Sequence, residues 1–295
     1  MSRPRSGPTV ALRLLAASLR TRREAAGVTL EDAARSLGVH TMTLSRLELA
    51  RTVPRRATVS HLLRLYTTPE EEADAVLKAL AEAKEPGWWH PWRDVLPEHM
   101  TGVIDLESEA ALIRVYAPGV VPELLQTPEY ARALLHLHHP KAGDGEIERR
   151  LQLLRERQQR VLHRSGRPAV LWALIEDAVL RRPIGGRAAM SEQIDFLDRY
   201  TRDRSSGITI QVIRAADGGH PLLLSGPASI LRYTHPALDD RLITRGLHSE
   251  AAALTEDPAA VSTYLAAMDE TAALAPPPTT PLPHPAQQER KAHPG

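Results

Sequence analysis

The arginines near the start of the chain are the residues whose type and spacing stand out first. Residues 1–66 contain 12 arginines, no lysine and four acids, a net charge of +8. The whole chain carries +1, so residues 67–295 carry 1 − 8 = −7. Guanidinium groups suit phosphates because they combine a permanent positive charge with fixed N–H donors. This asymmetry favours a phosphate-binding module ahead of an acidic body, and a merely solvated basic face is the alternative.

The elements expected to position this charge lie within residues 29–51. Thr29 is a good N-cap, which places Glu31 and Asp32 in the first helical turn, where the helix dipole favours carboxylates. Gly38 then ends this helix, because glycine adopts the left-handed conformation of a sharp turn without steric cost. The pattern predicts the first helix and the turn of a helix-turn-helix motif.

A second short helix is predicted after this turn, with Thr41 or His40 as its cap. The apolar positions expected to point at the first helix are Val39, Leu44 and Leu47. Their helical spacing leaves the opposite face of the second helix free, and this is the geometry with which such a helix enters a DNA groove. The motif therefore predicts a DNA-binding module.

Residues 12–66 resemble the Cro/cI-like, or XRE-type, helix-turn-helix regulators. The matching residues are Leu19-Arg20, Arg23-Glu24, Gly27-Val28-Thr29, Leu37-Gly38-Val39, Ser45-Arg46-Leu47-Glu48, Arg51 and Pro54. The resemblance implies an all-α, five-helix DNA-binding head whose recognition helix, at about residues 41–49, lies in the major groove. Two positions depart from the family pattern: His40 replaces a serine-like cap, and Ala50 replaces a glycine.

The resemblance also implies roles for individual residues. Those expected to contact DNA bases are Thr41, Met42, Thr43 and Arg46. Those expected to contact phosphates are Thr29, Arg51, Arg55 and Arg56. Arg46 is the principal candidate for base recognition, since a guanidinium can donate two hydrogen bonds to a guanine edge. Arg23 and Glu48 are expected to form a structural ion pair that joins the first helix to the recognition helix.

The body of the chain is predicted to be a mixed α/β (α+β) domain. Its expected strands are Val170–Ile175, Ile208–Ile213 and Ser229–Tyr233, which are short and apolar or alternating. The expected helices, with an acidic one before the body, are Pro69–Lys84, Glu107–Tyr116, Pro128–Leu137, Glu146–Arg164 and Pro258–Leu274. Residues 276–295 are rich in proline and poor in apolar residues, so they are predicted to be a disordered tail.

Residues 87–274 resemble the uncharacterised domain DUF5753, also described as Scr1-type antitoxin-like, which follows an XRE-type head in many actinobacterial regulators. The matching residues are Gly87-Trp88-Trp89, Leu106-Glu107, Ala110, Tyr116-Ala117-Pro118, Val121-Pro122, Leu124–Ala131 (LLQTPEYA), Arg157-Gln158, Glu176-Asp177-Ala178, Leu180-Arg181-Arg182-Pro183, Gly185-Gly186, Ile208–Val212, Gly219-His220-Pro221 and Gly226-Pro227. Glu123 replaces a usual glycine, and Arg241–Leu247 lacks a strand-like sequence of the relatives. The resemblance implies a regulator, often paired with a small neighbouring protein, with no established ligand or reaction.

The domain plan follows from these segments. It comprises a flexible basic N-terminus at 1–11, the head at 12–66, a connecting helix at 67–86, the regulatory or dimerisation domain at 87–275 and the tail at 276–295. Trp88, Trp89 and Trp92 lie within five residues, which favours a docking seam between head and body over an aromatic ligand cage.

Catalytic and metal chemistry receive little support. The chain has no cysteine, which excludes disulfides, thiolate catalysis and cysteine-bound zinc. Neighbouring carboxylates such as Glu107 with Glu109, Glu176 with Asp177 and Asp239 with Asp240 face different ways and are expected to be solvated. His136, His138 and His139 lack a companion acid at metal-ligand spacing, so a surface position is favoured. We expect no catalytic residue, metal or cofactor.

The sequence therefore predicts a sequence-specific transcriptional regulator that binds double-stranded DNA as a homodimer. The body is expected to serve dimerisation and to sense a small-molecule effector or a small protein partner. The alternative is an antitoxin-like interaction protein that binds a small partner and regulates its own promoter, and an enzymatic body is a weaker hypothesis. No stretch approaches a bilayer span, so we expect a cytoplasmic protein without membrane association.

Overall fold

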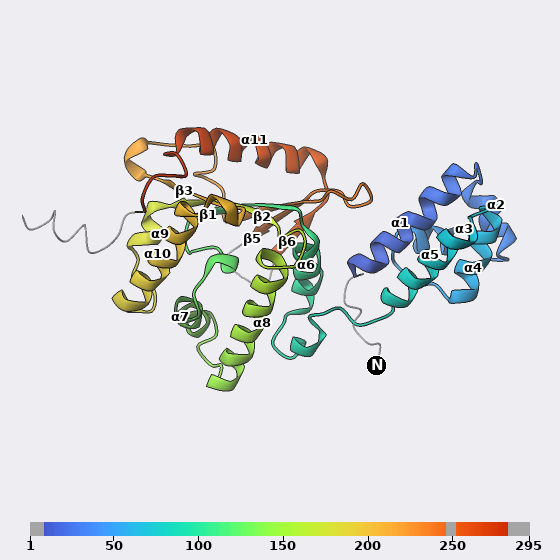
Figure 1. The fold of residues 1–295 in the computed structure, drawn as a ribbon, viewed down its shortest axis with the longest axis horizontal. Coiled ribbons are helices and arrows are strands. Elements are labelled where there is room, and N and C mark those ends of the chain that lie inside the picture. Colours follow the sequence, from blue (N-terminus) through green and yellow to red (C-terminus); the bar gives the residue numbers. More distant parts are fainter. Residues whose placement is uncertain (1–8, 246–251, 283–295) are drawn as a thin grey trace, which may run out of the picture. The chain divides into compact units, whose positions relative to one another are not determined.

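The structure is a computed structural model that describes residues 9–245 and 252–282 (Figure 1). The chain forms two compact units, the first mainly from residues up to 91 and the second from most of the rest. Each unit has its own hydrophobic core.

The first unit is a block of five helices. These are α1 (Val10–Ala25), α2 (Leu30–Ser36), α3 (Thr41–Glu48), α4 (Arg56–Leu65) and α5 (Glu70–Glu82). The core includes Leu15 and Leu19 of α1, Leu47 of α3, and Val76 and Leu80 of α5. The five-helix head is confirmed, but residues 12–66 hold only four of its helices. The predicted connecting helix is the fifth, because its apolar face packs into the same core.

The residues at the start of α1 and at both ends of α2 explain where these helices begin and end. The Thr9 side chain accepts a hydrogen bond from the Leu12 amide, so α1 begins at Val10, inside the segment predicted to be flexible. Residues 1–8 of that segment lie outside the described residues. Thr29 caps α2 by accepting from the Asp32 amide at 3.1 Å, and Gly38 follows α2 with a φ of +66°. The predicted cap and turn of the motif are present.

Thr67, just after α4, has a left-handed backbone with a φ of +51°. Its side chain is exposed, and a β-branched residue is strained in this region. We expect Thr67→Gly to raise the free energy of unfolding of the first unit by about 1 kcal/mol, measured by thermal unfolding. Thr58→Gly, inside α4, should lower it by about the same amount. A loss of stability in both variants would show that Thr67 is unstrained.

The second unit is built on a six-stranded mixed sheet, which confirms the predicted α/β class. Its strands are β1 (Leu112–Ala117), β2 (Val170–Glu176), β3 (Ile208–Ile213), β4 (Ala228–Arg232), β5 (Arg241–Arg245) and β6 (Ala252–Thr255). The order across the sheet is β3-β2-β1-β4-β5-β6. β1, β2 and β3 are parallel, whereas β4, β5 and β6 continue from β1 in antiparallel pairs. The three strands predicted from sequence are β2, β3 and β4.

Helices cover both faces of this sheet (Figure 1). The helices of the second unit are α7 (Pro128–His138), α8 (Asp144–Leu162), α9 (Asp177–Arg181), α10 (Gly186–Arg202) and α11 (Pro258–Leu274). Helix α6 (Glu98–Glu109) is divided, since its residues Thr101–Leu106 belong to the first unit and its two ends to the second. On one face α11 packs Val261 and Met268 against Leu174, Ile230 and Leu242 of the strands. α7, α8 and α10 lie on the opposite face.

Three sequence predictions for this unit are corrected. The helix predicted over Glu107–Tyr116 ends at Glu109, and β1 follows, because its LIRVYA sequence forms a central strand between β2 and β4. Arg241–Arg245, where a strand was in doubt, is β5. The predicted tail begins too early: Gln211 donates to the Pro276 carbonyl at 3.0 Å and Leu282 is buried, so residues 276–282 pack on the domain. Residues 283–295 lie outside the described part.

Candidate nucleic-acid interface

Helix α3 has one buried and one exposed face. Leu44 and Leu47 are 1% and 6% exposed and point into the first unit. Met42, Thr43 and Arg46 are exposed, and Thr41 is half-buried. Because residues four apart share a helix face, Met42 and Arg46 form one solvent-facing stripe. The structure thus places the four expected base-contacting residues at the accessible side of α3.

The two departures from the family pattern lie at the ends of this helix. His40 is the N-cap residue, and its side chain makes no capping hydrogen bond. Ala50, beyond the other end, keeps the left-handed backbone that glycine would favour, with a φ of +56°. Val39 is 38% exposed rather than packed against α2 as predicted, since it lies in the turn before α3 begins.

The arginines between α3 and the start of α4 are exposed and have no partner within the described part of the chain. Arg51, Arg55 and Arg56 are exposed, like Arg46. Within residues 9–245 and 252–282, none of these four side chains forms a hydrogen bond or ion pair. In contrast, Arg20 and Arg35 of the same unit are paired with acids at 2.9 and 2.6 Å. The free guanidinium groups are therefore concentrated from α3 to the start of α4, where anions can reach them.

Thr29, the remaining expected phosphate contact, is exposed but already engaged. Its hydroxyl accepts from the Asp32 amide and donates to the Asp32 carboxylate at 2.7 Å. The hydrogen bonds with Asp32 also hold the pKa of that carboxyl below its ordinary range, with a further contribution from Arg35. A phosphate contact through Thr29 would have to replace or share these bonds.

A half-buried ion pair fixes α3 against α1. Arg23 donates from Nε and Nη2 to the two carboxylate oxygens of Glu48 at 2.8 and 3.0 Å, and also to the Val28 carbonyl at 3.0 Å. The side chains are 11% and 6% exposed. Tyr66 lies in the same region, and burial together with the charge of Glu48 raises its pKa to about 12. This bidentate pair sets the orientation of α3.

Single and double alanine variants test the energetic role of the pair. Arg23→Ala and Glu48→Ala each leave one half-buried charge unpaired, so both should destabilise the first unit. We expect the double variant to lose less than the sum, with a coupling of about 1–3 kcal/mol measured by thermal unfolding. Arg35→Ala with Asp32→Ala, an exposed pair on α2, is the matched control and should couple by only about 0.5 kcal/mol. Additive losses at Arg23 and Glu48 would contradict a direct pair.

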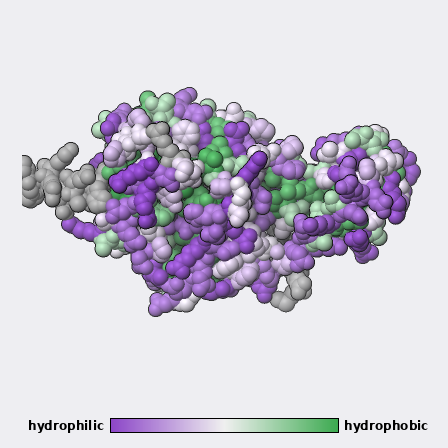
Figure 2. All heavy atoms as spheres, viewed as in Figure 1, coloured by the Kyte–Doolittle hydropathy of each residue, from purple (hydrophilic) through white to green (hydrophobic). Residues whose placement is uncertain are grey.

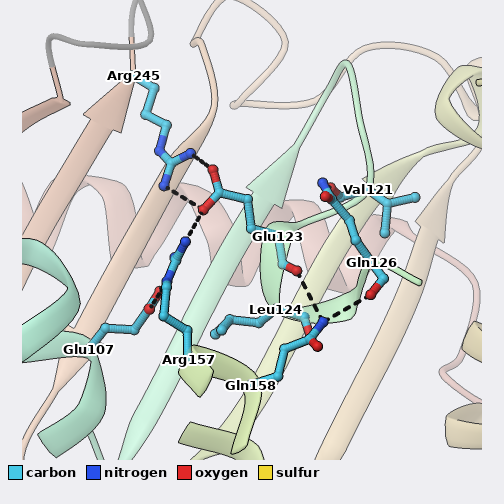
Figure 3. A network of polar contacts seen from close by, with 8 residues as sticks. All are labelled: Glu107, Val121, Glu123, Leu124, Gln126, Arg157, Gln158 and Arg245. Atoms are coloured by element: carbon cyan, nitrogen blue, oxygen red, sulfur yellow. Dashed lines mark hydrogen bonds and ion pairs between the residues drawn. The ribbon is translucent and has the colours of Figure 1, made fainter. Parts of the chain in front are cut away.

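The second unit contains a network of four charged side chains, of which Glu107 and Arg157 are buried and Glu123 and Arg245 are half-buried (Figure 3). Arg157 of α8 donates to both carboxylate oxygens of Glu107 at 3.0 and 3.1 Å and to Glu123 at 2.6 Å. Glu123 also pairs with Arg245 of β5. The network therefore joins α6, α8, β5 and the loop after β1 with alternating charges.

The charges of this network are mutually stabilised. Burial by itself would raise the pKa of Glu123, but Arg245 and Arg157 outweigh it and hold the pKa well below the ordinary 4.5. Burial would likewise lower the pKa of Arg157, yet Glu107 and Glu123 raise it above its ordinary value. Glu107 is only 8% exposed, so the expectation that this carboxylate is solvated is wrong. The pairing removes the cost that an isolated buried charge would have.

Sequence reasoning missed this network, although α8 carries a signal for it. Arg157 lies three residues after Leu154 and four before Val161, on the apolar face of the helix. A charged residue there requires a buried partner. The partners could not be identified, because they come from segments 34 to 50 residues away.

The LLQTPEYA motif at residues 124–131 has a structural role in this unit. Gln158 of α8 donates to the Gln126 carbonyl at 2.9 Å (Figure 3). The Tyr130 hydroxyl accepts from the Val121 amide at 3.1 Å. Tyr130 is fully buried. These bonds satisfy the polar groups of a buried loop.

A second polar cluster lies at the carboxyl ends of β1 and β2. Tyr116 donates to Glu176 at 2.9 Å, and His220 contacts the same carboxylate oxygen at 2.9 Å. The neighbouring Asp177 is 4% exposed and paired with Arg181, so the prediction that the Glu176 and Asp177 carboxylates are solvated is wrong.

A cavity of about 150 Å³ lies beside β3. It is lined by Asp177, Arg181, Ile210, Val212, Arg214, Pro276, Pro277, Thr280 and Pro281. It is large enough for a small molecule.

The described residues hold no group of three histidine, aspartate or glutamate side chains placed to bind a metal ion. His136 and His138 are exposed at the end of α7. No helix in the described part of the chain combines the length and apolar character needed to cross a bilayer. Hydrophilic residues dominate the visible surface of both units (Figure 2).

The five-helix block with its exposed α3 face defines a helix-turn-helix module. The family model described as a helix-turn-helix domain matches residues 14–76. The model described as a domain of unknown function (DUF5753) matches residues 100–281. Searches of curated proteins and of solved structures gave no significant match. The chain belongs to the DUF5753 family, with an XRE-type helix-turn-helix head, and is a DNA-binding regulator.

Proposed function

We propose that the chain is a sequence-specific transcriptional regulator whose α3 lies in the major groove of double-stranded DNA. The single observation that carries this proposal is the set of free arginines. Arg46 lies on the exposed face of α3, and Arg51, Arg55 and Arg56 follow it, all without a partner among the described residues. Arg46 with Thr41, Met42 and Thr43 contacts bases, and the others, with Thr29, contact phosphates.

The protein acts as a homodimer in this proposal, in the cytoplasm. One recognition helix covers only a few base pairs, and two half-sites a helical turn apart multiply specificity. The second unit supplies dimerisation and senses a signal. The cavity beside β3 is the candidate site for this signal, and its volume of about 150 Å³ suits a molecule of roughly benzene size. No reaction is proposed for this unit.

A titration of the full chain with DNA tests the proposal. Fluorescence anisotropy of labelled duplexes is measured from about 50 to about 200 mM salt. The logarithm of the binding constant should fall linearly with the logarithm of the salt concentration. Analytical ultracentrifugation of the complex should give two chains per duplex. Absence of DNA binding at the lower salt would contradict the proposed function.

The antitoxin-like alternative is a protein that chiefly binds a small partner and contacts DNA only for autoregulation. The observation in its favour is the net charge of residues 87–295, which is 1 − 8 + 4 = −3 once the acidic α5 segment (residues 67–86, −4) is counted with the first unit, and this sign suits a basic partner. Affinity capture with and without nuclease separates the two functions. A stoichiometric small protein retained after nuclease treatment would favour the alternative, and loss of all partners with the DNA would favour the regulator.

A further inference from the structure

Met42 is the most exposed large apolar side chain among the described residues of the first unit. It is 69% exposed, ahead of Leu49 at 52%, Val53 at 50% and Val39 at 38%. Isolated apolar residues on a surface need no explanation. Met42, however, lies in the first turn of α3, the part of a recognition helix that approaches base edges most closely.

Arg46 lies on the same stripe of α3 as Met42. The two residues are four apart, which corresponds to about 6 Å along the helix axis. Base pairs repeat every 3.4 Å or so, and this spacing therefore corresponds to about two base-pair steps. A guanidinium and an apolar thioether side chain thus face the groove floor side by side.

The largest apolar group that an unmodified base pair presents in the major groove is the 5-methyl group of thymine, since cytosine has only a C–H at the same position. The remaining hydrogen-bond donors and acceptors of the base edges are groups that Met42 cannot match. Arg46 matches guanine, whose two acceptors suit a bidentate guanidinium. The surrounding charge of the head, +8 over residues 1–66, supports DNA as the occupant of this face.

We propose that Met42 is a specificity-determining residue that recognises a thymine methyl group within about two base pairs of the guanine bound by Arg46. Val39, three residues earlier in the turn, lies beside the same end of α3 and adds apolar area. This inference rests on the proposed function and narrows the range of DNA sequences that the chain would bind. The target half-site contains a guanine and, within about two base pairs of it, a thymine that is recognised through its methyl group.

Uracil substitution tests the proposal, because uracil pairs as thymine does and lacks only the methyl group. The full chain first selects its tightest duplex from random DNA, and each thymine of that duplex is then replaced singly by uracil. We expect one position per half-site, near the guanine, at which uracil lowers affinity about fourfold. Met42→Ala should bind the thymine duplex about fourfold more weakly and show no further loss with uracil. Met42→Leu should keep the uracil effect.

Leu137→Ala is the matched control, because Leu137 of α7 is 68% exposed but belongs to the second unit. It should retain the full uracil effect. The proposal is overturned if uracil has no effect at any position, if the selected half-site has no thymine, or if Met42→Ala keeps the whole effect. Failure to enrich any sequence would overturn the proposed function as well, so the two failures are distinguishable.

Discussion

Arg157→Ala is expected to lower the free energy of unfolding of the second unit by about 3–5 kcal/mol. The substitution leaves Glu107, which is 8% exposed, and Glu123 without the guanidinium that both share. Two carboxylates then face each other in a poorly solvated site, where their repulsion is weakly screened. Hydrogen exchange of amides in α8 and β2 measures this loss in the second unit alone.

Two further variants define the cause of that loss. Arg157→Lys keeps the charge but cannot donate a bidentate pair, so it should recover only part of the stability. Arg160→Ala removes an exposed arginine from the same helix and should cost about 0.5 kcal/mol or less. A loss at Arg157 as small as that at Arg160 would show that the network does not hold the unit together.

Acid should weaken the same network. The pKa of Glu123 is lower in the folded chain than its ordinary 4.5, so its contribution is fully present above that value and is lost as the pH falls below it. The side chain is 34% exposed, and solvent screening therefore moderates the effect. The Arg157→Ala variant should lose less stability between neutral and acidic pH than the parent chain, as measured by hydrogen exchange at matched conditions.

Arg46→Ala is expected to abolish or relax the preference for one base pair of the operator, at a cost of about 1–3 kcal/mol in specific binding. Arg55→Ala should instead weaken binding to all sequences alike and reduce the salt slope by about one unit. The difference arises because base contacts specify, whereas phosphate contacts position. Anisotropy titrations against the selected duplex and a scrambled duplex measure both variants.

These two arginines are matched controls for each other, because both are exposed and unpaired in the first unit. An equal loss of specific and nonspecific binding by Arg46→Ala would contradict its base-contacting role. A loss of base preference in Arg55→Ala would assign specificity to the start of α4 instead of α3.

The local signals of the first unit were sufficient to predict it. The Thr29 cap, the Gly38 turn and the spacing of Leu44 and Leu47 act within one or two helical turns, and the structure contains each. Glycine at a left-handed turn and a hydroxyl at an N-cap carry their physical reason in the residue type. The fifth helix was predicted correctly as a helix, but packing against α1 assigns it to the head.

For the second unit, the sequence predicted the α/β fold class and three of the strands, but not β1. ITIQVI of β3 is β-branched and follows a turn, so it was recognisable. β1 was missed because its LIRVYA sequence follows an acidic helix without a strong breaker, and its pairing with β2 and β4 depends on distant segments. Tertiary pairing of this kind overrides local propensity.

Two departures from the family pattern turn out to be connected. The resemblance to DUF5753 implies a glycine where Glu123 stands and a different sequence around Arg245; the structure pairs the two side chains across 122 residues of sequence. Each was visible alone, but nothing in either segment indicates the other. A carboxylate in this position is tolerated because Arg245 and Arg157 compensate its charge.

The central claim is that α3 recognises a particular DNA sequence. Selection of random duplexes by the full chain, followed by sequencing of the bound fraction, tests it most directly. We expect an enriched motif with two guanine-containing half-sites about one helical turn apart, and loss of the guanine preference in Arg46→Ala. Equal recovery of all sequences, with binding that depends only on salt, would contradict it.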